Sequence, residues 1–292
     1  MNNEVHRYYY LWTFFVTFFK FRGGFFMKST RILALVSTCM MILALLVSGC
    51  GSSPAAEKSS SSSTSSAADK EFIIACDAKY APFSMEIDGK YKGIDVEILD
   101  AIAKVEGFKY QLKPMDFSGI IPGIVSGQLD GAIAGMNITE ERAKSVDFSD
   151  GYISSGSAVV VSKTNTTIKA IEDIQGKTVA VKKGTTGSTF AEDNKDKYKL
   201  NVTYYDDSPS MMMAVANGAA DFLIEDYPVI SYQIKIGEQD KLRVAVDAIN
   251  TPPQYGFAVK KGGNAELLKK FNEGLAKIKA DGTYDKIVKQ YL

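Results

Sequence analysis

The chain has 292 residues with 34 basic and 34 acidic side chains, a composition that suits a soluble globular protein of one large or two ordinary domains. A formal net charge of zero argues against a nucleic-acid-binding surface, because such a surface needs a net basic face. The only histidine, His6, and the only tryptophan, Trp12, both lie near the start of the chain.

Two apolar segments come first. Residues 8–19 are largely aromatic and fall short of the ~20 residues that a membrane-spanning helix needs. From Met27 the chain has a basic stretch, an apolar run at 32–47 and then small residues, which is the pattern of a secretory signal. We therefore predict that Met27 is the true start and that residues 1–26 are upstream sequence translated in frame; a start at Met1 is the alternative.

Residues 47–50, Val-Ser-Gly-Cys, resemble the lipobox of bacterial lipoproteins, in which the cysteine becomes the first mature residue and carries the lipid. The resemblance implies a signal peptide at 27–49 and a lipid anchor on Cys50, at the extracellular face of a Gram-positive cell membrane. A buried cysteine at the end of a helix is the alternative. Residues 50–70 are serine-rich and are predicted to form a flexible linker.

The composition of the mature chain excludes several kinds of chemistry. Removal of residues 1–49 leaves 29 basic and 33 acidic residues, a net charge of −4, and no histidine. A Ser-His-Asp triad, a Cys-His pair and every His-ligated metal site are therefore excluded. Cys76 lies in an apolar run and is predicted to be a small core residue, so we expect no disulfide, no metal and no cofactor.

From residue 71 onward, short apolar strands alternate with amphipathic helices. The pattern predicts strand 72–76, a hairpin turning at Asp88-Gly89, helix 95–105, strand 110–113, helix 118–126, strand 131–134, strand 178–181, helix 186–192 and helix 210–217. Such alternation indicates an α/β fold with parallel sheets and helices on both faces. The methionines at 211–213 are predicted to pack in the core instead of binding a soft metal.

An internal repeat with a spacing of 91 residues indicates two similar α/β lobes. Each copy spans a helix, its glycine cap and the next strand. The matching residues are Asp116, Gly127, Asp130 and Ile133 in the first copy, and Asp207, Gly218, Asp221 and Ile224 in the second.

Open α/β sheets bind ligands at the carboxyl ends of their strands, so the first residues after the predicted strands are candidate site residues. They are Asp77, Asn137, Lys182 and Asp226. Two acids, one base and one amide would thus converge at one edge. The alternative for each of them alone is a solvated loop position.

Two further features favour an anionic group in this site. Residues 182–188 lead from a strand into a helix, whose first turn Thr185 or Thr186 can cap and whose free N–H groups attract an anion. The loop is not of the phosphate-binding type, because its lysine precedes the glycines. Arg142, in a helix capped near Thr139, offers a fork that binds a carboxylate bidentately, unless it is a surface charge.

Residues 93–98, Gly-Ile-Asp-Val-Glu-Ile, followed by Ile102-Ala103, resemble the signature of family 3 periplasmic solute-binding proteins, which serve ABC transporters for polar amino acids. Glu106 departs from that signature. The runs 112–122 and 145–152 are similar to glutamine-binding members of the family, and the resemblance covers about residues 70–292.

The resemblance implies a two-lobed periplasmic-binding-protein fold of the Venus-flytrap, type II kind, with two hinge crossings. Lobe 1 would comprise residues 71–152 and 252–292, and lobe 2 residues 157–247, with hinges near Ser154 and Asn250. The two lobes would close on one amino acid.

The resemblance also implies a role for each site residue. Arg142, Thr185 and Thr186 would receive the α-carboxylate, and Asp226 the α-ammonium. Tyr80 and Phe117 would sandwich the aliphatic stem, while Asp77 and Lys182 face the end of the side chain; Gly135, Asn137 and Glu225 complete the set. Such a clamp makes physical sense, since either charge of a zwitterion left unpaired in a buried site costs several kcal/mol.

Asp77 and Lys182 together present one acceptor and one donor, which satisfies a carboxamide and makes glutamine the first choice of ligand. Two departures from glutamine-binding relatives weaken this choice. Glu225 stands where such a relative has histidine, and Asn137 where it has threonine. The negative charge of Glu225 favours a cationic ligand, so arginine or lysine, and also glutamate and cystine, stay open as alternatives.

The expected partners are the free amino acid and the permease and ATPase subunits of an ABC importer, with a monomeric binding protein and no nucleic acid. Two other functions remain as alternatives. A dehydratase-like enzyme on the same fold would use Asp77, Glu225, Asp226 or Lys182 as general acid or base. An adhesin or a ligand-sensing partner of a membrane receptor is the second.

Overall fold

The computed structural model describes residues 70–247 and 249–292. The predictions for the upstream extension, the signal peptide, the lipid on Cys50 and nearly all of the serine-rich linker therefore lie outside the described residues. Within the described part of the chain, no helix is both long enough and apolar enough to cross a membrane.

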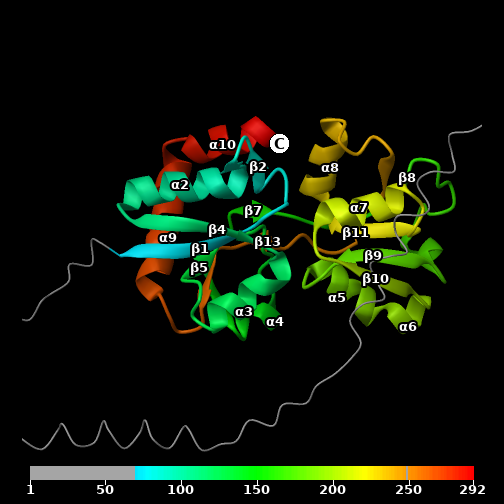
Figure 1. Cartoon of the computed structure of the whole chain (residues 1–292), viewed down its shortest axis with the longest axis horizontal. Coiled ribbons are helices and arrows are strands. Elements are labelled where there is room, and N and C mark those ends of the chain that lie inside the picture. Colours follow the sequence, from blue (N-terminus) through cyan, green and yellow to red (C-terminus); the bar gives the residue numbers. More distant parts are fainter. Residues whose placement is uncertain (1–69, 248) are drawn as a thin grey trace, which may run out of the picture. The chain divides into compact units, whose positions relative to one another are not determined.

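A first five-stranded sheet is built from two separate parts of the chain (Figure 1). Its strands are, in spatial order, β4 (Lys109–Met115), β1 (Glu71–Asp77), β5 (Gly131–Ala132), β14 (Ala258–Lys260) and β6 (Val146–Phe148). The helices associated with it are α2 (Ile94–Glu106), α9 (Ala265–Ala280) and α10 (Thr283–Tyr291), together with the short η2 (Phe117–Gly119), α3 (Ile120–Val125) and α4 (Glu140–Ala143).

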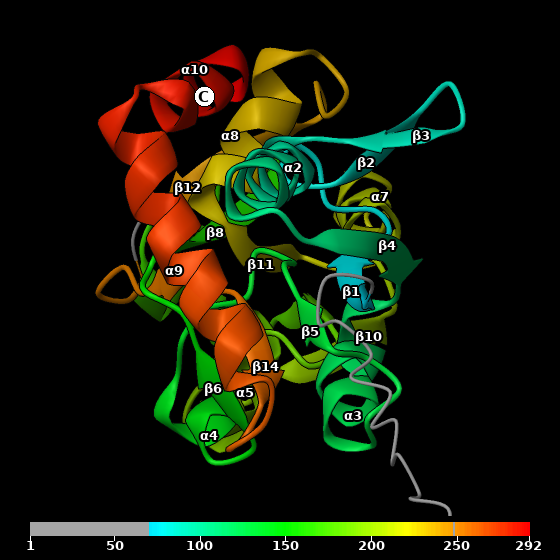
Figure 2. The same ribbon diagram turned by 90° about the vertical axis from the view of Figure 1, so that its left-hand side faces the viewer.

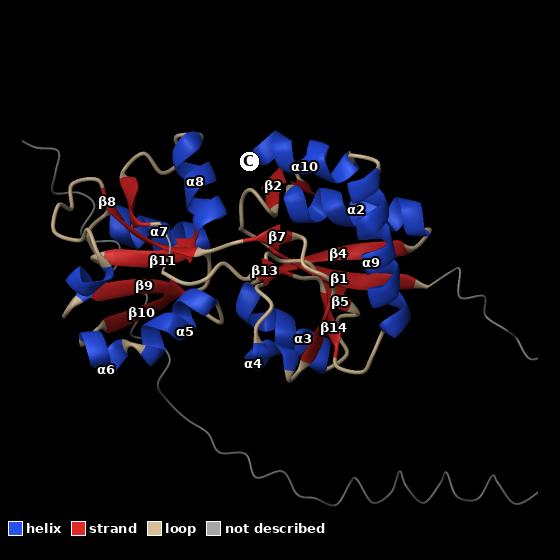
Figure 3. Ribbon diagram, turned by 180° about the vertical axis from the view of Figure 1, so that it is seen from behind, coloured by secondary structure: helices blue, strands red, loops and turns tan. Residues whose placement is uncertain are grey.

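Alternation along β1 explains why both faces of this sheet are covered. Ile74 packs in one core cluster with residues of α2 and α9, whereas its neighbour Ala75 packs in another with Ile120 and Ile124 of α3. Figure 2 shows α9 running across the sheet, and α3 lies at its other side (Figure 3). Cys76, in the same strand, is a fully buried free thiol, which confirms its predicted place in the core.

A second five-stranded sheet is formed by the middle of the chain. Its strands are, in spatial order, β10 (Asn201–Tyr205), β9 (Thr178–Lys182), β11 (Phe222–Asp226), β8 (Ser157–Ser162) and β12 (Leu242–Val246). Its helices are α7 (Ser208–Ala216) and α8 (Tyr227–Lys235), and α5 (Thr186–Asp193), α6 (Lys195–Tyr198) and η3 (Ile171–Ile174). Met211 and Met212 of α7 are buried as predicted, but Met213 is 60% exposed.

Two short strands join the sheets. β7 (Ile153–Ser154) carries the chain out of the first sheet, β13 (Gln254–Tyr255) carries it back, and the two pair antiparallel (Figure 3). A separate hairpin of β2 (Met85–Ile87) and β3 (Lys90–Lys92) turns at Asp88-Gly89, as the sequence predicts.

The prediction of parallel sheets is confirmed only in part, because both sheets are mixed. β1 runs parallel to β4 and β5, but β14 is antiparallel to its neighbours β5 and β6. In the second sheet β8 is antiparallel to β11 and β12. β8 and β14 are the strands that follow the two crossings, so they enter their sheets directly and without the crossover helix that parallel neighbours require.

The predicted repeat has a structural counterpart. Asp130 accepts a hydrogen bond from the backbone N–H of Ile73 (2.9 Å), and Asp221 accepts one from Thr178 in the second sheet (2.7 Å). Each aspartate thus ties the start of one strand to the start of its parallel neighbour. Helix–glycine–strand units of the same kind therefore build both halves.

Candidate ligand-binding site

The residues at the strand ends converge as the sequence predicts. Asp77 ends β1, Lys182 ends β9 and Asp226 ends β11, while Asn137 follows β5 and bridges to β13. Lys182 Nζ lies 2.8 Å from Asp77 Oδ2, and Asn137 Nδ2 lies 3.4 Å from Asp226 Oδ2. Groups from both sheets therefore meet in one place.

These groups surround a small cavity of about 20 Å³, which is room for about one water molecule. Its lining includes all the predicted site residues except Asp77. Asp77 instead accepts a hydrogen bond from Lys182, which does line the cavity. The lining residues are Tyr80, Phe117, Gly135, Asn137, Arg142, Ser157, Lys182, Thr185, Thr186, Gly187, Ile224, Glu225 and Asp226.

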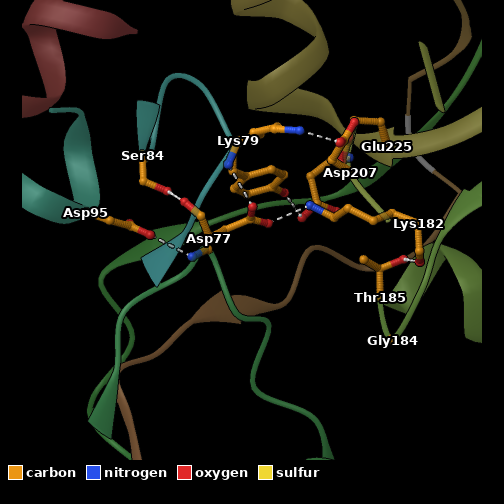
Figure 4. Close-up of polar contacts among 12 residues, drawn as sticks. Asp77, Lys79, Ser84, Asp95, Lys182, Gly184, Thr185, Asp207 and Glu225 are labelled. Carbon is orange, nitrogen blue, oxygen red and sulfur yellow. Dashed lines mark hydrogen bonds and ion pairs between the residues drawn. The ribbon is translucent and has the colours of Figure 1, made fainter. Parts of the chain in front are cut away.

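Asp77 and Lys182 form an almost completely buried ion pair that joins the two sheets (Figure 4). The ammonium also lies 4.0 Å from the centre of the Tyr80 ring. Burial alone would lower the pKa of Lys182, but the charges of Asp77 and Glu225 outweigh it and the pKa is raised. Lys182 therefore stays cationic at neutral pH.

Asp226 is buried among hydroxyl donors. Its Oδ2 accepts hydrogen bonds from Tyr80 Oη (2.9 Å) and Tyr255 Oη (2.6 Å), and its Oδ1 accepts one from Ser157 Oγ (3.3 Å). Burial raises the pKa of this carboxyl, although the two tyrosine hydroxyls and Lys182 oppose the shift. The arrangement offers a carboxylate to a cationic group in the cavity.

Arg142 presents its guanidinium beside the Phe117 ring, 5.2 Å from its centre. Thr139 caps the short helix α4 by accepting from the backbone N–H of Arg142 (3.2 Å), which fixes where this side chain starts. Nη1 donates to Asn137 O (2.7 Å) and Nη2 to Gly184 O (2.9 Å). Burial lowers the pKa of Arg142 only to about 10, so the fork remains charged.

The turn before α5 supplies the other donors predicted for an anion. Thr185 caps the helix, since its Oγ1 accepts from the backbone N–H of Ser188 (3.2 Å). Thr186 Oγ1 lies 3.3 Å from Asn137 Nδ2. The helix start, Asn137 and the Arg142 fork therefore face one another across the two sheets.

Gly135 is required by the close approach of the Tyr80 ring. Its backbone has φ +54°, and a Cβ at this position would lie 2.4 Å from a carbon of that ring. Its N–H donates to Asp95 Oδ2 (2.7 Å), and Asp95 Oδ1 accepts from Tyr152 Oη (2.7 Å). Burial raises the pKa of Asp95 to about 7, although both hydrogen bonds oppose the shift.

Glu225 has an incompletely satisfied carboxylate. Oε1 accepts from the backbone N–H of Asp226 (2.9 Å), whereas Oε2 is buried and has no hydrogen-bond partner among the described residues. Burial raises the pKa of Glu225 to about 7; the charge of Lys182 opposes this shift and that of Asp226 adds to it. Glu225 is therefore poised to change charge near neutral pH.

Sequence reasoning missed four residues that shape this site: Ser157, Tyr255, Gly187 and Ile224. Tyr255 lies on the two-residue crossing strand β13, where no periodic pattern marks it. Ser157 is the first residue of β8, which runs antiparallel to β11. An antiparallel strand starts at the edge where its parallel neighbours end, so Ser157 could be predicted only if the direction of β8 were known.

Residues 72–292 match the family described as bacterial extracellular solute-binding proteins, family 3. The chain belongs to this family. It is 34% identical to the ABC transporter arginine-binding protein 1 of Escherichia coli K12, over 73% of this chain and 87% of that protein. It is 31% identical to the glutamine-binding protein GlnH of Bacillus subtilis, over 91% and 98% of the two chains.

A solved structure of an ancestral arginine-binding protein bound to arginine is similar, with a TM-score of 0.71 and 38% identity over 76% of this chain and 98% of that one. The fold is thus the two-lobed, type II periplasmic-binding-protein fold that the sequence predicts. The chain is an extracellular or periplasmic substrate-binding protein of an amino acid ABC importer, and not an enzyme.

Proposed function

We propose that this protein delivers L-glutamine to its importer. The buried Lys182–Asp77 ion pair carries the proposal. At 2.8 Å the two charges neutralise each other, yet the remaining ammonium protons and carboxylate lone pairs can still bond a neutral carboxamide. A carboxamide uses one donor and one acceptor without adding charge next to either partner.

The same proposal assigns the common part of an amino acid to the rest of the site. Arg142, Thr185 and Thr186 bind the α-carboxylate, and Asp226 binds the α-ammonium. Tyr80 and Phe117 enclose the stem. In support, Arg142 is a half-buried fork and Asp226 a buried carboxylate, the two groups that a zwitterion needs, and both face the same cavity.

Binding then requires the two lobes, residues 71–152 with 252–292 and residues 157–247, to separate and close again. The cavity has room for about one water, and its polar groups bond to each other across the sheets. An entering amino acid replaces those contacts: its carboxylate takes the Arg142 fork from Gly184 O, and its ammonium takes Asp226 from Tyr80.

A cationic amino acid is the second candidate, and Glu225 is the observation that favours it. With Glu225 ionised, the site holds two positive groups, Arg142 and Lys182, and three negative ones, Asp77, Asp226 and Glu225. A zwitterion with a neutral side chain leaves this excess of one negative charge, whereas arginine or lysine cancels it. The pKa of Glu225, about 7, decides how strongly this matters.

The test is a thermal-shift panel of the twenty common amino acids on residues 51–292, followed by calorimetry on each amino acid that raises the melting temperature. Glutamine should give the largest shift. A shift with arginine, lysine or cystine and none with glutamine would overturn the choice of ligand. No shift with any amino acid would contradict the assignment of this cavity as the site.

We further propose that the protein acts as a monomer at the membrane surface, anchored by a lipid on Cys50, and that it passes its ligand to the permease and ATPase subunits of the importer. The lipobox-like residues 47–50 support the anchor. Palmitate labelling of cells that express the chain tests it: Cys50→Ser should abolish the label, and a label that persists would refute the assignment.

A further inference from the structure

The two lobes contact each other both inside the amino acid site and outside it. Inside the site, the contacts use the groups that a ligand is proposed to bind. Outside it, Lys79 of the first lobe forms an ion pair with Asp207 of the second, with Nζ 2.8 Å from Oδ2 (Figure 4). Neither side chain lines the amino acid site. A ligand can therefore bind without displacing this pair.

A second and larger cavity, of about 560 Å³, shows where this pair bridges the lobes. The cavity lies between the β2–β3 hairpin, which contributes Met85, and helices α7 and α8, which contribute Met212 among other residues. Lys79 lines it from the first lobe, and Ser208, the residue after Asp207, lines it from the second. The two lobes thus face each other across open space here, and the ion pair spans that space at its edge.

Backbone groups hold both ends of the pair. Asp207 Oδ1 accepts from the backbone N–H of Ser210 (2.8 Å) and caps α7, which leaves Oδ2 for the lysine. The backbone N–H of Lys79 donates to Asp77 Oδ1 (3.0 Å), so the turn that carries Lys79 is tied to the ion pair inside the site. The Asp207 side chain is only 13% exposed. Because this carboxylate is already fixed, the pair forms with a smaller loss of side-chain entropy than a pair of two free side chains.

Both members of the pair are charged at neutral pH. Burial alone would raise the pKa of Asp207, but the hydrogen bonds from Lys79 and Ser210 outweigh it and lower the pKa to about 2. The hydrogen bond to Asp207 raises the pKa of Lys79. The pair therefore stays charged throughout the neutral range, whereas added salt screens it, because the Lys79 side chain is 60% exposed.

We propose that the Lys79–Asp207 pair is a latch that favours the closed arrangement of the lobes and thereby raises the affinity for every amino acid ligand by one common factor. Its two members lie on different lobes, so the pair exists only while the lobes are closed. It acts on the closing equilibrium and not on the recognition of a side chain. The inference rests on the proposed function, in which binding requires the lobes to separate and close.

Asp207→Asn and Lys79→Met test the latch by calorimetry with L-glutamine and with L-arginine on the chain from Gly51 onward. Asparagine keeps the cap of α7 and loses the charge, and methionine keeps an unbranched side chain without the ammonium. Each variant should weaken both ligands by the same factor, about two- to fivefold, which is the usual range for an exposed ion pair. The double variant should lose no more than either single variant, because both changes remove the same interaction.

Asp206→Asn is the matched control. Asp206 directly precedes Asp207 and pairs with Lys183 at 2.6 Å, but both of these residues belong to the second lobe. The variant removes the same charge from the adjacent position without breaking a contact between the lobes, so it should leave both affinities unchanged. The affinity of the unmodified protein relative to Asp207→Asn should also fall towards one between about 0.05 M and about 0.5 M sodium chloride, because salt screens the pair only where it is present.

Three results would overturn the latch. They are a loss in Asp207→Asn no greater than in Asp206→Asn, losses that multiply in the double variant, and a loss that differs between glutamine and arginine, since a difference means that Asp207 acts on the ligand directly. Where only one of the two amino acids binds, the control and the double variant decide on that one. Failure of the unmodified protein to bind any amino acid would instead refute the proposed function, and the latch with it.

Discussion

Glu225 should make the preference between cationic and neutral ligands depend on pH. Its pKa is raised to about 7, chiefly by burial. The carboxyl is therefore about 10% ionised at pH 6 and about 90% ionised at pH 8. A ligand with a cationic side chain gains an ion pair only with the ionised form, whereas a neutral side chain gains none.

The expected size follows from this ionised fraction. The affinity for L-arginine relative to L-citrulline, its neutral isostere, should fall about tenfold from pH 8 to pH 6, which is about 1.4 kcal/mol. Two charges 4 Å apart attract by about 4 kcal/mol at an effective dielectric constant of 20, so an interaction of this size is physically reasonable. Titrations by calorimetry at pH 6, 7 and 8 give the ratio.

The ratio of arginine affinity to citrulline affinity cancels the effects of other groups that titrate between pH 6 and pH 8. Asp226 is proposed to bind the α-ammonium, which both ligands share, and Asp95, with a pKa of about 7, contacts Gly135 and Tyr152 and not Glu225. Both therefore affect the two ligands equally. In Glu225→Gln the ratio should no longer vary with pH. A flat ratio in the unmodified protein, or an unchanged slope in the variant, would refute the reasoning.

The remaining predictions concern the common part of the site and its support. Arg142→Ala should weaken every amino acid ligand by at least 100-fold in calorimetry, because the guanidinium is proposed to bind the carboxylate that all of them share; selective loss of one ligand would show that Arg142 has another role. Gly135→Ala should lower stability by about 1–3 kcal/mol in urea unfolding, since its Cβ would lie 2.4 Å from the Tyr80 ring, and a loss no greater than that of Gly127→Ala, which has φ +79° and open space around it, would contradict this. Asp95 has its pKa raised by burial from 3.8 to about 7, so the native state holds a proton that the unfolded state releases, and this carboxyl makes stability fall between about pH 4 and 7. Asp95→Asn should reduce that fall by up to about 4 kcal/mol, and an equal pH slope in both proteins would count against the assignment.

The sequence predicted the convergence of Asp77, Lys182 and Asp226 because their positions follow from a general property of α/β sheets: the carboxyl ends of parallel strands lie at one edge. The prediction required only the strand limits and not their order in the sheet. The direction of β8 and β14 could not be predicted in this way, since it depends on where the chain crosses between the sheets.

The supporting residues were harder to predict because their partners are distant in sequence. Asp95 accepts from Gly135, 40 residues away, and Tyr255 reaches Asp226 from a two-residue strand. Hydrophobic periodicity identifies neither contact. Asp95 lies in the family-like motif at residues 93–98, and that motif gives no reason for its burial.

The contacts that join the two sheets inside the amino acid site and the contacts proposed for the ligand use the same atoms. Asp226 accepts from Tyr80, and Arg142 donates to Gly184 across the sheets. Neither side chain can bond its internal partner and the ligand fully at the same time. The ligand must therefore bind Asp226 and Arg142 more strongly than Tyr80 and Gly184 do. A zwitterion meets that condition, since it forms a full ion pair with each of these groups, whereas the internal partners, a tyrosine hydroxyl and a backbone carbonyl, are neutral.

The Asp77–Lys182 pair differs, because a carboxamide can bond to it without separating it. In the proposed cycle this pair separates when the lobes open and forms again when they close around the ligand. Selectivity for the charged backbone of an amino acid would thus come from contacts that the ligand replaces, and selectivity for its side chain from a contact that forms again beside it.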